Sequence, residues 1–180
     1  MIILIAGASH TGKTVLAQRM LERFGFPYLS IDHLKMGLIR SGNTDLTPLD
    51  DDKLTDYLWP IVREMIKTAI ENNQNLIVEG CYIPVNWRKD MGIKYLKDIR
   101  YICLAFSDNY IDRYFTNIMA HESDVEKRSF DSDLTPEWFK EQNHIVIEEC
   151  NRNSLGVTVI DSDYDMIIDG LINEIAAELY

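Results

Sequence analysis

A loop bracketed by two glycines, close to the amino terminus, limits what this chain can fold into more than any other stretch. An apolar run, Met1–Ala6, leads into Gly7–Thr14, whose sequence GASHTGKT matches the pattern G-x-x-x-x-G-K-[ST] at every fixed position. Apolar residues then recur with a helical period as far as Phe24, and Gly25 follows as a stop signal. The stretch therefore predicts a buried strand, a tight loop and a helix in direct succession.

The residue types in this loop suit the binding of phosphate groups. Glycine at both bracketing positions lets the backbone adopt positive φ angles and approach a ligand closely, and the N–H groups at the start of the following helix attract anions. The lysine supplies a point charge for the outer phosphates, and the threonine supplies a hydroxyl for Mg²⁺. The alternative interpretation is an ordinary glycine-rich turn before a helix. The residues expected to bind the phosphates are Gly7, Ser9, His10, Thr11, Gly12, Lys13 and Thr14.

The charge of the chain argues against several classes of partner. Its formal net charge is -11 and its pI is about 4.7, and a field of that sign repels nucleic acids and anionic membranes. An anionic substrate would therefore have to be held by local arginines. Apolar runs such as Met1–Ala6 are far too short for a membrane span or a signal peptide.

Length and cysteine content indicate one domain in a reducing compartment. A chain of 180 residues with 46% hydrophobic residues can bury one sizeable core. The three cysteines, Cys81, Cys103 and Cys150, form no C-x-x-C motif, which indicates reduced thiols and a cytoplasmic protein. The four histidines lack the spacing of metal ligands. We expect a monomer or a weak dimer.

Strand and helix patterns alternate along the chain, which predicts an α/β fold with a parallel sheet covered by helices on both faces. Pro60 lies within the longest helical pattern and predicts a kink there, or two helices that meet. The expected strands are Ile2–Ala6, Pro27–Ile31, Asn75–Glu79, Asp98–Phe106 and Val157–Ile160. The expected helices are Lys13–Phe24, Asp32–Ser41, Asp50–Asn73, a weak one at Pro84–Met91, Asp108–Met119, Pro136–Asn153 and Tyr164–Leu179.

This layout and four short segments resemble the nucleotide and small-molecule kinases of the P-loop class, a group that includes adenylate, shikimate, gluconate and 2-phosphoglycerate kinases. The segments are Gly7–Thr14, Ser30–His33, Val78–Pro84, and Asp112-Arg113 with the charged stretch that follows. The resemblance implies a single three-layer P-loop domain over residues 1–180, with a five-stranded parallel sheet in the order 2-3-1-4-5. It also implies a mobile lid at about residues 120–134, and ATP with Mg²⁺ as the phosphate donor.

Three acidic residues have a role implied by the resemblance and a plain structural alternative. Asp32 would accept or orient the acceptor hydroxyl, or would simply cap the next helix. Glu79 would order the water shell of Mg²⁺ or hold acceptor hydroxyls, or would be a solvated strand end. Asp161, in the turn after the last strand, would line the adenine pocket or cap the final helix.

Four arginines are candidates for binding the charged groups of the substrates. Arg113 and Arg128 flank the expected lid and would stabilise the phosphoryl group in transfer, with an ion pair to a nearby acid as the alternative for Arg128. Arg40 and Arg88 would clamp an anionic acceptor, or would lie on solvated surfaces.

The expected function is transfer of the γ-phosphate of ATP·Mg to a small-molecule acceptor, with Lys13, Asp32 and Arg113 as the catalytic residues. One alternative is a nucleoside monophosphate kinase, although Asn117 stands where adenylate kinases place a second arginine, and Glu79 stands where nucleotide kinases have aspartate. The other is an ATP-binding regulatory module with little transfer activity. The chain has no Asn-Lys-x-Asp signature of a GTPase.

Overall fold

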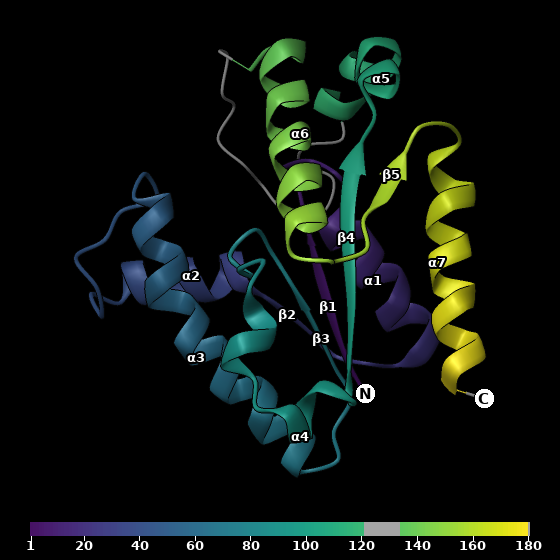
Figure 1. The fold of residues 1–180 in the computed structure, drawn as a ribbon. Coiled ribbons are helices and arrows are strands. Elements are labelled where there is room, and N and C mark those ends of the chain that lie inside the picture. Colours follow the sequence, from purple (N-terminus) through teal and green to yellow (C-terminus); the bar gives the residue numbers. More distant parts are fainter. Residues whose placement is uncertain (121–133, 180) are drawn as a thin grey trace.

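A five-stranded parallel sheet, in the order β2-β3-β1-β4-β5, forms the centre of the structure (Figure 1). The computed structural model describes residues 1–120 and 134–179. The predicted strand order is confirmed, and every predicted strand is present to within one residue at each end. The strands are β1 (Ile2–Gly7), β2 (Tyr28–Ser30), β3 (Leu76–Glu79), β4 (Ile99–Phe106) and β5 (Thr158–Ile160).

The central strand, β1, has apolar partners on both faces. Ile2 and Leu4 pack into the cluster on one face of the sheet, and Ile3 and Ile5 pack into the cluster on the other. All four side chains are fully buried. An uninterrupted apolar run suits a strand that is covered on both faces, whereas an alternating pattern would suit a sheet with one wet face.

Helices cover both faces of this sheet (Figure 1). On one face α1 (Lys13–Phe24) and α7 (Tyr164–Leu179) pack over β1. On the opposite face the core includes residues of α2 (Ile31–Arg40), α3 (Asp51–Glu71), α4 (Ile93–Leu96) and the end of α6 (Pro136–Arg152). A third apolar cluster, between α5 (Asp108–Ala120) and the start of α6, lies beyond the carboxyl end of β4. The three-layer α/β arrangement is the predicted one.

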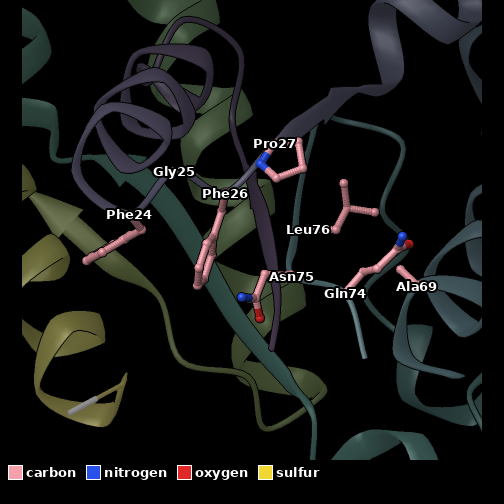
Figure 2. A pocket seen from close by; sticks show the side chains of 8 residues that line it. All are labelled: Phe24, Gly25, Phe26, Pro27, Ala69, Gln74, Asn75 and Leu76. Atoms are coloured by element: carbon pink, nitrogen blue, oxygen red, sulfur yellow. The ribbon is translucent and has the colours of Figure 1, made fainter. Parts of the chain in front are cut away.

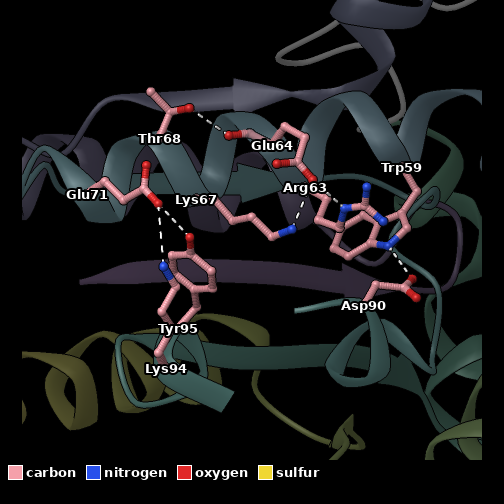
Figure 3. Close-up of polar contacts among 9 residues, drawn as sticks. All are labelled: Trp59, Arg63, Glu64, Lys67, Thr68, Glu71, Asp90, Lys94 and Tyr95. Atoms are coloured by element: carbon pink, nitrogen blue, oxygen red, sulfur yellow. Dashed lines mark hydrogen bonds and ion pairs between the residues drawn. The ribbon is translucent and has the colours of Figure 1, made fainter. Parts of the chain in front are cut away.

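Polar contacts fasten α3 to the segment between β3 and β4 (Figure 3). The indole Nε1 of Trp59 donates to Asp90 at 2.9 Å, and the Tyr95 hydroxyl donates to Glu71 at 2.5 Å. Asp90 belongs to a short 3₁₀ helix, η1 (Trp87–Asp90), and Tyr95 belongs to α4. These contacts help to hold the long connection between β3 and β4 against the outer layer.

Two expectations about helices differ from the structure. The predicted helix Pro84–Met91 is wrong in extent and type, because only η1 forms there and the chain turns at Gly92 before α4 begins. Of the two alternatives predicted at Pro60, a kink or two helices that meet, the second is wrong, since α3 continues through the proline as one helix. A proline removes a single N–H donor, and the fully buried side chains of Leu58 and Val62 on either side of it keep the helix packed.

All three cysteines are free thiols. Cys103 in β4 and Cys150 in α6 are buried with their sulfur atoms 3.3 Å apart, and Cys81 is exposed. Within residues 1–120 and 134–179, no helix combines the length and the apolar character that crossing a membrane would need.

Candidate active site

The two glycines that bracket the loop between β1 and α1 occupy positions where a Cβ would clash with neighbouring atoms. Gly7 has a φ of +141°, and a Cβ there would lie 2.2 Å from the carbonyl oxygen of Leu104 in β4. Gly12 has a φ of +82°, and a Cβ there would lie 1.8 Å from the hydroxyl oxygen of Tyr164, at the start of α7. The positive φ favours glycine at both positions; the Leu104 backbone also leaves no room at Gly7, whereas at Gly12 the Tyr164 side chain would have to move. Bare backbone can approach a bound group closely.

His10 bends the middle of the loop and contacts α6. Its φ is +65°, in the left-handed region that is uncommon for residues other than glycine. Its ring packs edge-on against Phe139, with the ring centroids 5.1 Å apart, and its Nδ1 lies 2.8 Å from the Ser9 hydroxyl. The first part of α6 thus supports the loop from one side.

The loop curls around the ammonium group of Lys13. This side chain is buried, and its Nζ donates to the carbonyl oxygen of Ala8 at 2.7 Å. The Thr11 hydroxyl donates to the same carbonyl at 2.8 Å. A buried positive charge inside a loop of backbone N–H groups is an arrangement that attracts anions such as phosphates.

The end of β3 brings a carboxylate to this loop. Ile5 of β1 is the register partner of Glu79, and the Thr14 hydroxyl donates to the Glu79 carboxylate at 3.3 Å. Glu79 is 1% exposed, so the alternative of a solvated strand end is wrong. The next residue, Gly80, has a φ of +151°, and a Cβ there would lie only 3.0 Å from Ile31 in α2. The turn after β3 is therefore packed tightly between the loop and α2.

The hydroxyl of Thr14 and the carboxylate of Glu79 are oxygen donors of the kind that Mg²⁺ prefers. The described ranges contain no group of three or more His, Cys, Asp or Glu side chains that could hold a metal ion. Two oxygen donors beside a phosphate-binding loop fit Mg²⁺ bound together with ATP, because that ion usually takes one or two protein ligands and completes its shell with phosphate and water oxygens.

A chain of polar contacts lies on the other side of Glu79, across the first turns of α2 and α3. Ser30 occupies the N-cap position of α2, so Asp32 lies inside the helix and is not its cap. The Nζ of Lys35 lies 2.6 Å from the Asp32 carboxylate and donates to the Tyr82 hydroxyl at 3.0 Å. That hydroxyl donates to Asp51 at 2.7 Å. Burial, together with the Asp51 carboxylate, raises the pKa of Tyr82 far above its ordinary value, so the hydroxyl keeps its proton.

Of the predicted arginines, the three that the structure describes, Arg40, Arg88 and Arg113, are not brought to these carboxylates. Arg40 is exposed in the last turn of α2, about 12 Å along the helix axis from the first turn. Arg88 is exposed and donates to the carbonyl of Ser154, in the turn before β5, at 3.5 Å. Arg113 is exposed on α5. Arg128 and residues 121–133 of the expected lid lie outside the described residues.

The turn between β5 and α7 places a tyrosine against the loop. Asp161 is exposed in this turn and is not the cap of α7, because Asp163 accepts from the backbone N–H of Met166 at 2.9 Å. The Tyr164 hydroxyl is buried against Gly12 and, in the part of the chain that is described, has no hydrogen-bond partner. Burial raises the pKa of Tyr164 to about 12.

Reasoning from the sequence did not identify Lys35 or Tyr164 as members of this site. A signal for Lys35 was present, since it follows Asp32 at the three-residue spacing of ion pairs on a helix. No local pattern marks Tyr164, because its contact with Gly12 joins opposite ends of the chain.

A separate pocket of about 450 Å³ lies at the opposite end of the sheet (Figure 2). Its lining comes from the end of α1 and from the segments that lead into β2 and β3, whereas the glycine loop follows the carboxyl end of β1. The pocket is therefore not part of the candidate site. The residues that line it are Phe24, Gly25, Phe26, Pro27, Ala69, Gln74, Asn75 and Leu76.

Solved structures with this fold include several P-loop small-molecule kinases, although no family model and no curated protein matches the chain. A deoxyadenosine kinase from M. mycoides has a TM-score of 0.58 at 16% identity, covering 98% of this chain and 100% of that one. A gluconokinase from Sinorhizobium meliloti 1021 has a TM-score of 0.53 at 15% identity, covering 99% and 94%. A shikimate kinase from Aquifex aeolicus has a TM-score of 0.53 at 10% identity, covering 99% and 98%. At these identities the likeness establishes the fold, which is that of P-loop kinases.

Proposed function

We propose that the protein transfers the γ-phosphate of ATP, bound together with Mg²⁺, to a hydroxyl group of a small acceptor. The observation that carries the proposal is the loop Gly7–Thr14, in which Lys13 is buried and Thr14 contacts the carboxylate of Glu79. The fold supports the proposal, because solved structures of similar fold include a gluconokinase, a shikimate kinase and a deoxyadenosine kinase.

On this proposal the loop and its flanking residues hold the donor. The loop amides and Lys13 bind the β and γ phosphates, with the ammonium turning from the Ala8 carbonyl to the ligand. Thr14 would be a ligand of Mg²⁺, and Glu79 would hold a water of its shell. Bound Mg²⁺ would offset part of the phosphate charge. Tyr164, whose hydroxyl lies against the loop, donates to a phosphate oxygen.

The remaining residues act on the acceptor and on the group in transfer. Asp32 orients the acceptor hydroxyl and receives its proton, with Lys35 holding the carboxylate in place. Arg113 stabilises the charge on the transferring phosphoryl group, and Arg128 is a second candidate for that role. Asp161 belongs to the turn that would border the adenine ring.

The test is a comparison of Lys13→Ala with Lys97→Ala, which removes an exposed lysine distant in the fold from the loop. Isothermal titration and a coupled ADP-release assay should show ATP binding and turnover reduced by about a hundredfold in the first variant. The second variant should behave like the wild-type protein. A Lys13→Ala protein that bound and turned over ATP normally would contradict the proposal.

The same assay separates the proposal from the two alternatives. A nucleoside monophosphate kinase would release ADP when supplied with AMP, CMP or UMP. An ATP-binding regulatory module would bind ATP tightly through Lys13 yet form no phosphorylated small molecule from a metabolite extract. The proposed kinase forms such a product.

A further inference from the structure

The acceptor side of the candidate site is built mainly from carboxylates. Glu79, at the end of β3, is the register partner of Ser30 at the end of β2, and Asp32 lies two residues beyond Ser30, in the first turn of α2. Asp51, at the start of α3, joins them through Tyr82. We refer to Asp32, Asp51 and Glu79 as the acceptor carboxylates.

The lysine among these groups, Lys35, is already paired with Asp32 and hydrogen-bonded to Tyr82. Its Nζ lies 2.6 Å from Asp32, donates to the Tyr82 hydroxyl, and lies 4.9 Å from the centre of the Tyr82 ring. Its side chain is 12% exposed. Asp32 and Tyr82 take two of its three N–H donors, so an anionic acceptor would have to share this ammonium with the Asp32 carboxylate. Lys35 is therefore a positioning residue for Asp32.

Two of the acceptor carboxylates are fixed by buried partners or by their own burial, although Asp51 itself is exposed. Tyr82 is 6% exposed, and its hydroxyl fixes the Asp51 side chain at 2.7 Å. Glu79 is buried. Of the cations nearby along the chain, Lys53 is mostly exposed and paired with Asp50, and Arg40 lies at the far end of α2. Among residues 1–120 and 134–179, the acceptor carboxylates therefore outnumber the one lysine that pairs with Asp32.

We propose that the acceptor is an uncharged or cationic alcohol, and that the acceptor carboxylates exclude alcohols of the same size that carry a phosphate or carboxylate group. This inference rests on the proposed function. The acceptor oxygen forms a bond to the γ-phosphorus as its proton passes to Asp32. The bond from that phosphorus to the bridging oxygen breaks, and ADP leaves with the electron pair. An anion brought to this position is repelled by these carboxylates, most strongly by the buried Glu79, whereas an ammonium group is attracted.

The test uses a deproteinised metabolite extract passed over an anion-exchange resin. The fraction that flows through contains neutral and cationic compounds, and the retained fraction contains anions. Each is then incubated with the protein and γ-labelled ATP, with Lys13→Ala as the control. We expect labelled product from the flow-through fraction. Lys13-dependent product mainly from the retained fraction would overturn the inference and leave the proposed function standing. No Lys13-dependent product from the whole extract would count against the proposed function itself.

A pair of variants tests whether Asp51 contributes to this selection. Asp51→Asn keeps an oxygen that accepts from Tyr82 but removes the charge, so the fold is retained. It should raise the yield of labelled product from the retained fraction, relative to the flow-through fraction, by about threefold. Asp56→Asn removes a charge elsewhere on α3 and should leave that ratio unchanged. An unchanged ratio in Asp51→Asn would overturn the role of Asp51 in selection.

Discussion

At the scale of single residues, Gly12 meets two demands that can be separated experimentally. It has a φ of +82° and faces the Tyr164 hydroxyl, whereas Gly25 has a φ of +70° and no atom within 4 Å of the point that a Cβ would occupy. Gly25→Ala should therefore reduce the free energy of unfolding only by the cost of a positive φ in alanine, about 1 kcal/mol. Gly12→Ala should reduce the free energy of unfolding further, because the clash with Tyr164 adds to that cost. It should also weaken ATP binding about tenfold or more.

Urea unfolding and ATP titration of the two glycine variants provide the measurement. Equal losses of stability in both variants would mean that Tyr164 moves aside without penalty. A Gly12→Ala protein with normal ATP affinity would show that the loop tolerates a side chain at the position that faces Tyr164.

Glu79 gives a prediction about the metal ion. Glu79→Gln keeps the size of the side chain and an oxygen for Thr14, but removes the negative charge beside it. The Mg²⁺ concentration that half-saturates ATP turnover should rise by about tenfold, as expected for a group that orients a metal-bound water. Glu22→Gln, at an exposed position of α1, is the matched control and should leave it unchanged. An unaltered Mg²⁺ dependence in Glu79→Gln would remove Glu79 from the proposed metal site.

The contrast between predicted and missed residues has a physical cause. The position of Lys13 and Thr14 at the start of the helix after the loop could be predicted, because the motif fixes residue types at fixed spacing along the chain. The hydroxyl of Tyr82 meets Lys35 and Asp51 only after three separate elements have packed, so no local pattern encodes that contact. Whether an arginine reaches the acceptor site also depends on helix direction and length, which composition does not determine.

At the scale of elements, α6 is tied to the end of β4 by one buried amide. Asn143 is fully buried, accepts from the backbone N–H of Phe106 at 2.6 Å and donates to the carbonyl of Phe139 at 2.7 Å. In the sequence, Asn143 can be recognised as a single polar residue on the apolar face of the helix, between Phe139 and Cys150. The same helix carries the ring that packs on His10, so this amide helps to position the loop.

Asn143→Leu should leave the Phe106 N–H buried without an acceptor and should destabilise the protein by about 2 kcal/mol. Glu141→Ala, at an exposed position of the same helix, should change stability by about 0.5 kcal/mol or less. Urea unfolding monitored by tryptophan fluorescence measures both. Equal stability of the two variants would show that water or a rearranged backbone satisfies the N–H group.

Elements with a strong local signal could be predicted closely, and those without one could not. Thr135 caps α6 through the N–H of Trp138, as the Thr-Pro-Glu sequence predicts. The segment that forms η1 and α4 has neither a cap nor a long apolar period, and its structure depends on contacts with α3. Pro60 shows that a proline need not end a helix, since the buried neighbours Leu58 and Val62 lie on either side of it within one continuous α3.

At the scale of the whole molecule, two opposing fields act on an approaching nucleotide. The chain carries a net charge of -11, which repels anionic ATP·Mg at long range. The buried Lys13 and the loop amides attract it only at short range. Added salt screens the long-range repulsion strongly and affects buried contacts much less.

The rate constant for ATP association should therefore rise with salt, in contrast to the fall expected for a protein with a basic surface. Between about 10 mM and about 100 mM KCl the screening length falls from roughly 30 Å to roughly 10 Å, which is less than the width of the domain. Stopped-flow binding of a fluorescent ATP analogue measures the change, and sucrose at matched osmolality serves as the control. If the association rate constant fell with added KCl, attraction of ATP by cations around the loop would be stronger than its repulsion by the net negative charge of the protein. The proposed acceptor is not anionic, so the net negative charge of the protein does not repel it. If the acceptor is neutral, ATP should therefore be the only substrate whose association rate constant rises with KCl.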